Sequence, residues 1–244
     1  MRALFTASAL ALAPILALAA CSEDPTPREV QDQEVTDLNR SNSDSEALAK
    51  AKSLPAGDMT EFTLGGRIGE RTSAMSNSAG NFADLRGFVA CPKGIDPCDP
   101  KTAPAGTVYT YALVVYPGGD NDASTGIGAG NTASDIERAT AFRMTMPAHG
   151  FTGKAGYAKP EALAAIGPKA DVVISCDAGK IVWTVSAGDG GNQWEQKEPL
   201  TFYWQSTLPP AGTAKAYAFA ADSTEAVGSG PYPAAKEGVA NACS

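Results

Sequence analysis

Residues 107–116 place the strongest constraint on the fold, because they predict a strand that is apolar on both faces. One face carries Tyr109, Tyr111, Leu113 and Val115, and the other carries Val108, Ala112 and Val114. Successive side chains of a strand point to opposite faces, so both faces of this strand must be covered. We therefore expect it to be a central strand of a β-sheet.

Other segments also have the length and alternation of strands, and turn-forming residues bound them. Gly65 and Gly66 are expected to bend or bulge the first of these strands. Residues 72–81 are rich in Ser, Asn and Gly, and they predict a loop. The predicted strands besides 107–116 are residues 60–64, 86–91, 136–146, 171–176, 180–187, 200–206 and 213–221.

One short helix and two tight connections complete the pattern. Pro160 and Gly167 suit the start and the end of a helix over residues 160–166. The turn at 177–179 predicts a hairpin, and residues 208–212 are expected to join another pair of strands. The sequence thus predicts an all-β chain, an antiparallel β-sandwich of about eight strands with one short helix.

Between Tyr109 and Asp222 the chain resembles the immunoglobulin-like domains of bacterial surface proteins. The points of likeness are a Tyr-rich strand, a strand ending at Cys176, the pattern Gly-x-Ile-x-Trp-x-Val at 179–185, and Leu-Pro-Pro-Ala-Gly at 208–212. This resemblance implies the immunoglobulin-like sandwich and says nothing about function.

The first 21 residues have the layout of a bacterial export signal. Arg2 precedes an apolar run that is interrupted by Pro14 and is too short to span a bilayer comfortably. The run ends in Leu-Ala-Ala-Cys, which resembles the lipobox of bacterial lipoproteins. That resemblance implies cleavage before Cys21 and lipidation of its thiol, and Ser22 in place of Asp favours the outer membrane. The alternative is an ordinary secretory leader that ends beside a cysteine.

The expected organisation is a signal peptide (1–20), a lipidated acidic tether (21–57) and one folded domain (58–244). The tether contains three prolines and no aromatic residue after Cys21, so it cannot bury enough apolar surface to fold alone. Within it, residues 43–54 have a weak pattern for a short helix. The chain has 19 basic and 27 acidic residues and a net charge of −8, which argues against nucleic acid as a partner.

Four cysteines follow the tether, and an even number in an exported chain predicts two disulfides. Of the three pairings, Cys91–Cys98 with Cys176–Cys243 is favoured, because two prolines and a glycine let the first loop curl back on itself. The alternative is a four-thiolate metal site. Structural zinc usually uses cysteine pairs two to four residues apart, whereas six and 66 residues separate these cysteines.

No familiar catalytic pattern is found in the sequence. Its one histidine, His149, lies between Ala148 and Gly150, where we expect a loop residue and not a catalytic base. Patterns for a nucleophile elbow, a zinc protease or a phosphate-binding loop are missing, and we expect no cofactor. A hydrolase with two carboxylates would leave no linear motif, because such groups meet only in the folded chain.

Two polar loops carry candidate ligand-binding residues. Asp120 and Asp122 are weak candidates for calcium, which prefers carboxylate oxygens, although such clusters also suit ordinary turns. Asp189, Asn192 and Trp194 form the second candidate group. An exposed Trp194 would stack on a sugar ring or anchor a protein contact. The alternative is that Trp194 folds back and caps the sandwich.

The sequence therefore favours a non-catalytic envelope lipoprotein. We expect it to be lipid-anchored, at the outer membrane facing the periplasm or cell surface, with a β-sandwich that binds or scaffolds a protein or glycan partner. The alternatives are a glycan hydrolase that uses paired carboxylates and a glycan-binding module centred on Trp194. This order reflects a chain with many turn and core features and no convergent reactive group.

Overall fold

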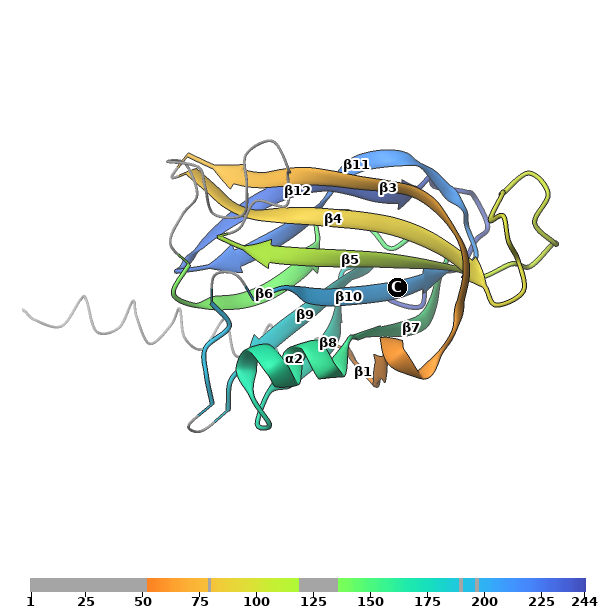
Figure 1. Ribbon diagram of the computed structural model, residues 1–244. Helices are drawn as coiled ribbons and strands as arrows, with labels where there is room; N and C mark the ends of the chain where they lie inside the picture. Colours follow the sequence, from red (N-terminus) through yellow and green to blue (C-terminus); the bar gives the residue numbers. More distant parts are fainter. Residues whose placement is uncertain (1–51, 79, 119–135, 189–190, 196–197) are drawn as a thin grey trace, which may run out of the picture. The chain divides into compact units, whose positions relative to one another are not determined.

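The structure is a computed structural model that describes residues 52–78, 80–118, 136–188, 191–195 and 198–244 (Figure 1). The predicted signal peptide, Cys21, the calcium candidates Asp120 and Asp122, and Asp189 lie outside these residues. Within them, no helix is long and apolar enough to cross a bilayer.

The described chain consists of twelve strands, the helix α2 and the short 3-10 helix η1. The two helical elements are η1 (Met59–Glu61) and α2 (Lys159–Ile166). The strands are β1 (Lys52–Leu54), β2 (Ala56–Asp58), β3 (Leu64–Asn77), β4 (Gly80–Pro92), β5 (Tyr109–Pro117), β6 (Ala139–Met144), β7 (Phe151–Tyr157), β8 (Asp171–Asp177), β9 (Lys180–Ser186), β10 (Leu200–Ser206), β11 (Pro210–Ala221) and β12 (Thr224–Pro233).

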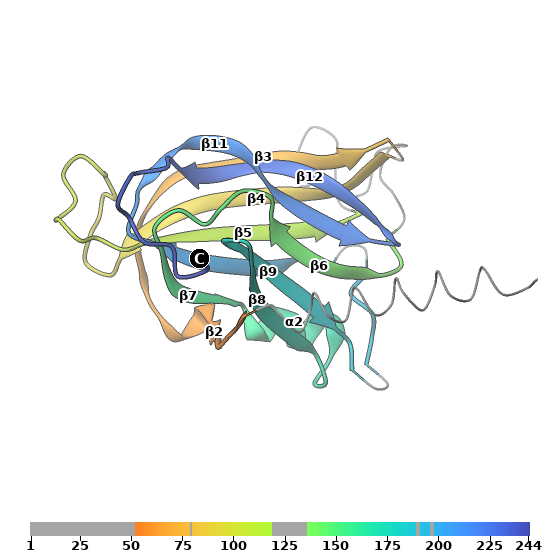
Figure 2. The ribbon, with the colours of Figure 1, turned by 180° about the vertical axis from the view of Figure 1, so that it is seen from behind.

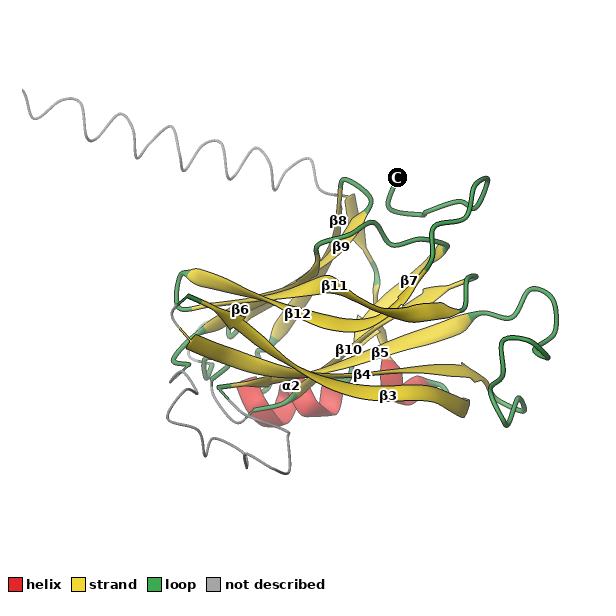
Figure 3. Cartoon of the chain, turned by 90° about the horizontal axis from the view of Figure 1, so that it is seen from above, coloured by secondary structure: helices red, strands yellow, loops and turns green. Residues whose placement is uncertain are grey.

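All twelve strands belong to one sheet of order β1-β8-β9-β6-β11-β12-β3-β4-β5-β10-β7-β2. The sheet curls so that β3, β4, β5 and β10 face β12, β11 and β6 across the core (Figures 2 and 3). Strands β1 and β2 follow one another in the chain, yet β1 pairs with β8 and β2 pairs with β7. Residues 52–58 therefore bridge the two edges of the sheet and nearly close it into a barrel.

This architecture confirms the prediction of an all-β chain with one short helix and corrects the predicted immunoglobulin-like sandwich of about eight strands. A sandwich has two separate sheets, whereas here the two layers are joined on both sides. On one side β12 pairs with β3 through Val227 and Ser76. On the other side lies the bridge formed by residues 52–58. The result is a single barrel-like sheet.

The folded body begins before the predicted boundary at residue 58. Lys52–Leu54 and Ala56–Asp58 are strands that pair in register with β8 and β7. The end of the segment predicted as a weak helix, residues 43–54, is therefore strand β1. The seam needs a chain segment to satisfy the hydrogen-bonding groups at both sheet edges, and this segment supplies it.

Strand β5 is central, as predicted. It pairs with β4 on one side and β10 on the other, and all of its residues except Tyr116 are buried. Inside the sheet, Tyr111 stacks on Trp204 with ring centroids 4.5 Å apart. The ring centroid of Phe142 lies 5.1 Å from that of Phe202, and both rings are part of the same core. Aromatic rings thus fill the interior.

Several local predictions are confirmed. Both favoured disulfides, Cys91–Cys98 and Cys176–Cys243, are formed. The β8–β9 hairpin turns at Ala178 and Gly179, whose φ angles are 46° and 80°, as a turn of this length requires. Helix α2 ends at Gly167, whose N–H donates to the Leu163 carbonyl.

Other element predictions are wrong. Residues 72–81, predicted as a loop, belong mostly to the long hairpin of β3 and β4, and residues 60–64 are η1 and the approach to β3. Strands β7 and β12 were not predicted from the sequence. Strands β10 and β11 are not partners: β10 pairs with β5 and β7, and β11 pairs with β6 and β12.

Candidate functional site

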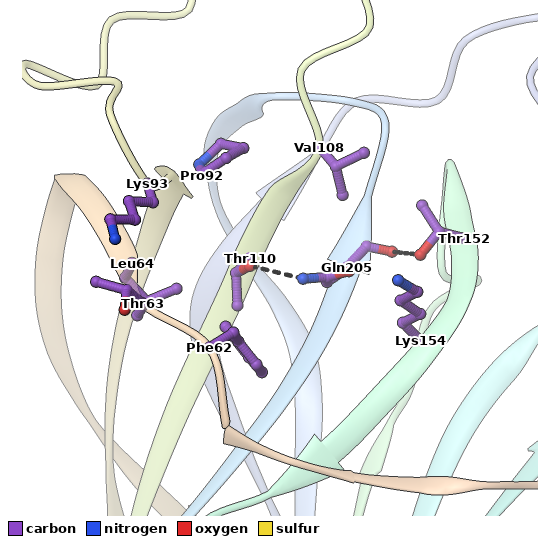
Figure 4. A pocket seen from close by; sticks show the side chains of 10 residues that line it. All are labelled: Phe62, Thr63, Leu64, Pro92, Lys93, Val108, Thr110, Thr152, Lys154 and Gln205. Carbon is purple, nitrogen blue, oxygen red and sulfur yellow. Dashed lines mark hydrogen bonds between the residues drawn. The ribbon is translucent and has the colours of Figure 1, made fainter. Parts of the chain in front are cut away.

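A pocket of about 280 Å³ lies on the outer face of the sheet, where the segment before β3 crosses the start of β5 (Figure 4). We call it the Phe62 pocket. Its volume is just below the range that is typical of ligand sites in proteins. Ten residues from five parts of the chain line it: Phe62, Thr63, Leu64, Pro92, Lys93, Val108, Thr110, Thr152, Lys154 and Gln205.

One wall of the pocket comes from the start of β3 and the loop closed by the first disulfide. A Cβ on Gly65 would lie 2.3 Å from the Pro92 carbonyl oxygen, so only glycine lets the two segments approach this closely. The Gly66 N–H donates to the Ile95 carbonyl at 2.8 Å. The pairing of β3 with β4 shifts register after Leu64, which confirms the predicted bulge at the two glycines. These contacts fix the loop that carries Lys93.

The opposite wall is a second bulge, in β7. Trp204 of β10 pairs with Ala155, but Ser206 pairs with Phe151, so extra residues of β7 are pushed out between these two pairs. Gly153, in the bulge, has a φ of +88°, a conformation that residues with a side chain rarely adopt. Bulges re-aim side chains and often border functional sites. This one brings Thr152 and Lys154 to the rim.

The floor is a hydrogen-bonded pair on neighbouring strands. Gln205 of β10 lies opposite Thr110 of β5, and its Nε2 donates to Thr110 Oγ1 at 3.2 Å. The Thr152 hydroxyl donates to the Gln205 carbonyl oxygen at 3.3 Å (Figure 4). The floor therefore has a fixed orientation before any ligand arrives.

The apolar part of the pocket is also held in place. The Phe62 ring packs edge-on against Tyr203, with centroids 5.0 Å apart. Burial raises the pKa of the Tyr203 hydroxyl to about 12, so this residue is neutral at physiological pH. Leu64 packs on a small outer cluster that contains Phe88 and Ala112. Phe62 and Leu64 thus line a preformed wall.

Asp58 anchors the segment that leads to Phe62. Its Oδ1 accepts hydrogen bonds from the Thr60 backbone N–H at 3.0 Å and from the Thr60 hydroxyl at 2.9 Å, which caps η1. Partial burial acts to raise the pKa of Asp58, but these hydrogen bonds outweigh it and the net shift is downward. The carboxylate is therefore ionised and keeps its capping role at neutral pH.

The charge of the pocket is positive. Lys93 and Lys154 lie on opposite sides of it (Figure 4), both are exposed, and neither forms an ion pair with another described residue. None of the described residues that line the pocket is acidic. In a chain with a net charge of −8, this is a local reversal of sign.

The loop residues predicted as ligand contacts lie elsewhere. Trp194 is only 1% exposed, and its Nε1 donates to the Glu198 carbonyl at 2.8 Å. It therefore packs in the core, and a sugar ring has no free indole face to stack on. Asn192 is exposed, and its backbone N–H donates to the Ile166 carbonyl. Neither residue lines the Phe62 pocket.

Other reactive side chains are scattered in the described part of the protein. His149 is half-buried in a turn, with its ring 5.7 Å from that of Tyr232. A surface hollow contains both Glu137 and Asp222, but the Asp222 carboxylate accepts hydrogen bonds from the backbone N–H groups of Glu137 and Arg138. No group of three metal-ligating side chains occurs among the residues described.

The sequence carried partial signals for the Phe62 pocket. Gly65–Gly66 and the Cys91–Cys98 loop were both recognised, but as isolated local features. Lys93 and Lys154 gave no signal of their own in the sequence. They come to the same pocket because β10 pairs with both β5 and β7, and these strands are far apart in the sequence.

Comparison with known proteins gives no relative. No protein-family model matches the chain, and no significant match was found among curated proteins or among solved structures. A function must therefore be argued from the geometry of the chain itself.

Proposed function

We propose that this protein is a lipid-anchored, non-catalytic binding protein of the bacterial envelope. Its lipid is carried by Cys21, and its barrel-like body holds a small ligand, or a small group of a larger protein or glycan partner, in the Phe62 pocket. The placement favoured by the sequence is the outer membrane, facing the periplasm or the cell surface.

The observation that carries the binding part is the convergence of two bulges on one hollow. A bulge interrupts the regular hydrogen bonds between two strands, and bulges are over-represented beside functional sites. Here the bulge after Leu64 and the bulge at Gly153 border the same pocket, over a floor oriented by Gln205 and Thr110. A preformed concave site with a few placed polar groups is the usual form of a ligand site.

The lining supports binding in preference to catalysis. It offers lysines, hydroxyls and an amide, with no histidine, cysteine or carboxylate among its described residues. General acid–base chemistry near neutral pH usually uses one of those groups. The burial of Trp194 removes the feature that would favour a glycan-binding module centred on it.

Native mass spectrometry of the protein purified from its own envelope tests the binding role. A Val108→Trp variant would fill the pocket with an indole, while Thr184→Trp places the same side chain at an exposed position of β9. We expect a bound mass on the wild type and on Thr184→Trp that is lost from Val108→Trp. The same spectrum for all three proteins would reject the pocket as the binding site.

Lipid anchoring is tested separately by metabolic labelling with an alkyne palmitate analogue. The wild type should carry the label and sediment with outer membranes, and Cys21→Ser should lose both properties. Unlabelled wild-type protein in the soluble fraction would reject the anchor and leave the pocket unaffected.

A further inference from the structure

The two lysines of the Phe62 pocket mark it as an anion site. Lys93 comes from the disulfide loop and Lys154 from the bulge of β7, so two independent elements bring positive charge to one hollow. Neither ammonium group is neutralised by a carboxylate among the described residues. Uncompensated charges in a concave site attract ligands of the opposite sign.

The floor adds a neutral donor. Thr110 Oγ1 accepts the hydrogen bond from Gln205, and its own hydrogen is not donated to any other described residue. The Thr110 side chain is nearly buried, with the residue 3% exposed, so a ligand atom that accepts this hydrogen satisfies a donor that water reaches poorly. Two lysine side chains and a hydroxyl thus line the same pocket.

The remaining lining is apolar. Phe62, Leu64 and Val108 line the same pocket as the two lysines (Figure 4). A bare inorganic anion would leave these side chains in contact with water, whereas an aromatic or branched body would cover them. At about 280 Å³ the pocket suits a group of roughly one ring's size with its acidic substituent.

We propose that the Phe62 pocket binds a small organic anion, in which a carboxylate or phosphate is carried on a short apolar or aromatic body. This inference rests on the proposed function, because it names the ligand class of the same pocket. The acidic group lies between Lys93 and Lys154 and accepts the Thr110 hydroxyl hydrogen. The body packs on Phe62, Leu64 and Val108.

Calorimetric titration of the full lipidated protein in neutral detergent tests this with matched probes. Benzoate and benzamide have nearly the same shape and differ in charge, so benzoate should bind at least tenfold more tightly. Phenyl phosphate compared with benzoate shows which acidic group is preferred. Inorganic phosphate tests the need for the apolar body, and it should bind at least tenfold more weakly than phenyl phosphate.

Charge-removing variants locate the site. Lys93→Gln and Lys154→Gln should each weaken benzoate or phenyl phosphate binding about twofold to fivefold, the range expected for exposed charges. Lys215→Gln, at an exposed position of β11, removes the same charge and should leave the affinity unchanged. All three variants should keep the wild-type melting temperature, because these lysines make no described ion pair.

The outcomes separate this inference from the proposed function. Equal affinities for benzoate and benzamide would overturn the anion class, and so would the absence of binding by every anion probe. In either case, a native bound mass that is lost in Val108→Trp would still uphold the pocket. If that mass were also the same in all variants, the proposed function would fail as well.

Discussion

The indole of Trp194 is fixed at both its polar and its apolar ends. Its Nε1 donates to the Glu198 carbonyl, and its ring packs edge-on against Phe202 and Phe219, with centroids 5.7 and 5.4 Å apart. The Trp194 carbonyl in turn accepts a hydrogen bond from the Ala139 N–H at 2.7 Å. The residue therefore connects its loop to the barrel core.

Replacing this side chain with alanine should be costly. Trp194→Ala removes a large buried ring and its hydrogen bond, and we expect the free energy of unfolding to fall by about 3–5 kcal/mol. Urea unfolding followed by circular dichroism measures this. Gln193→Ala, at the exposed neighbouring position, should change it by less than about 0.5 kcal/mol. A loss below about 1 kcal/mol for Trp194→Ala would contradict its role in the core.

Buried tyrosines predict weaker stability at alkaline pH. Burial raises the pKa of Tyr111 and Tyr217 well above the ordinary value, and it raises that of Tyr232 to about 12. The unfolded chain therefore releases these protons first, at about pH 10. The contribution of these tyrosines to the free energy of unfolding is complete below pH 10. It is lost progressively as the pH rises above 10, by up to about 1.4 kcal/mol per pH unit for each tyrosine.

The variant Tyr217→Phe isolates one of these groups. It should lower the free energy of unfolding by about 1 kcal/mol at pH 8, because the hydrogen bond to the Pro231 carbonyl is lost. It should also reduce the decline of the free energy of unfolding between pH 10 and 11. Phe219→Leu is the non-titrating control, which lowers stability at every pH without changing that slope. An unchanged slope in Tyr217→Phe would show that Tyr217 does not contribute to it.

At the scale of elements, the seam of the barrel depends on two glycines that face each other. A Cβ on Gly156 of β7 would lie 2.1 Å from the Gly57 carbonyl oxygen, and a Cβ on Gly57 would lie 2.0 Å from the Tyr203 hydroxyl. These two residues are partners in the parallel pairing of β2 with β7. The close approach of the strands therefore requires glycine at position 156, while at position 57 the Tyr203 hydroxyl occupies the space of a side chain.

Gly156→Ala should open this seam. The added methyl clashes with backbone on β2, and overpacking of this kind typically costs about 1–3 kcal/mol. We expect faster proteolysis within residues 52–58, measured by limited digestion and mass spectrometry. Gly69→Asn is a suitable control, because that site has open space and a φ of +53°, which asparagine tolerates. Equal digestion of Gly156→Ala and the wild type would contradict the seam.

Elements with a clear periodic pattern were predictable, and elements shaped by packing were not. Residues 107–116 alternate cleanly and form β5, and residues 160–166 carry both helix boundary signals. In β3, by contrast, Met75 is the only fully buried residue, so the strand has little apolar alternation to detect. Strand β12 contains Gly228 and Gly230, which suggest a turn in the sequence.

Those glycines serve packing. A Cβ on Gly228 would lie 2.7 Å from Met75, and one on Gly230 would lie 2.7 Å from Tyr217.

The candidate site, too, could be predicted only in part. Gly65 and the Cys91–Cys98 loop were visible locally, but the proximity of Lys93 and Lys154 depends on strand pairings distant in sequence. Such pairings follow from the whole sheet and not from any short pattern.

At the scale of the whole molecule, the two disulfides have different structural roles. Cys176–Cys243 ties the C-terminal segment to β8 and closes a separation of 67 residues, whereas Cys91–Cys98 closes a separation of seven. In the loop-entropy description, the longer link contributes about 4.5 kcal/mol and the shorter about 2.5 kcal/mol. Only the shorter link closes the loop that carries Lys93 at the Phe62 pocket.

Removing each disulfide should therefore separate stability from binding. The pair of substitutions Cys176→Ala and Cys243→Ala should cause the larger loss in the free energy of unfolding and leave the affinity for benzoate nearly unchanged. Cys91→Ala with Cys98→Ala should cost less stability but weaken benzoate binding several-fold, because the loop can then move Lys93 away from Lys154. Urea unfolding and calorimetric titration of both proteins measure the two effects. If affinity instead falls in proportion to stability in both, the disulfide loop has no particular role at the pocket and the two links differ only in the length of chain they close.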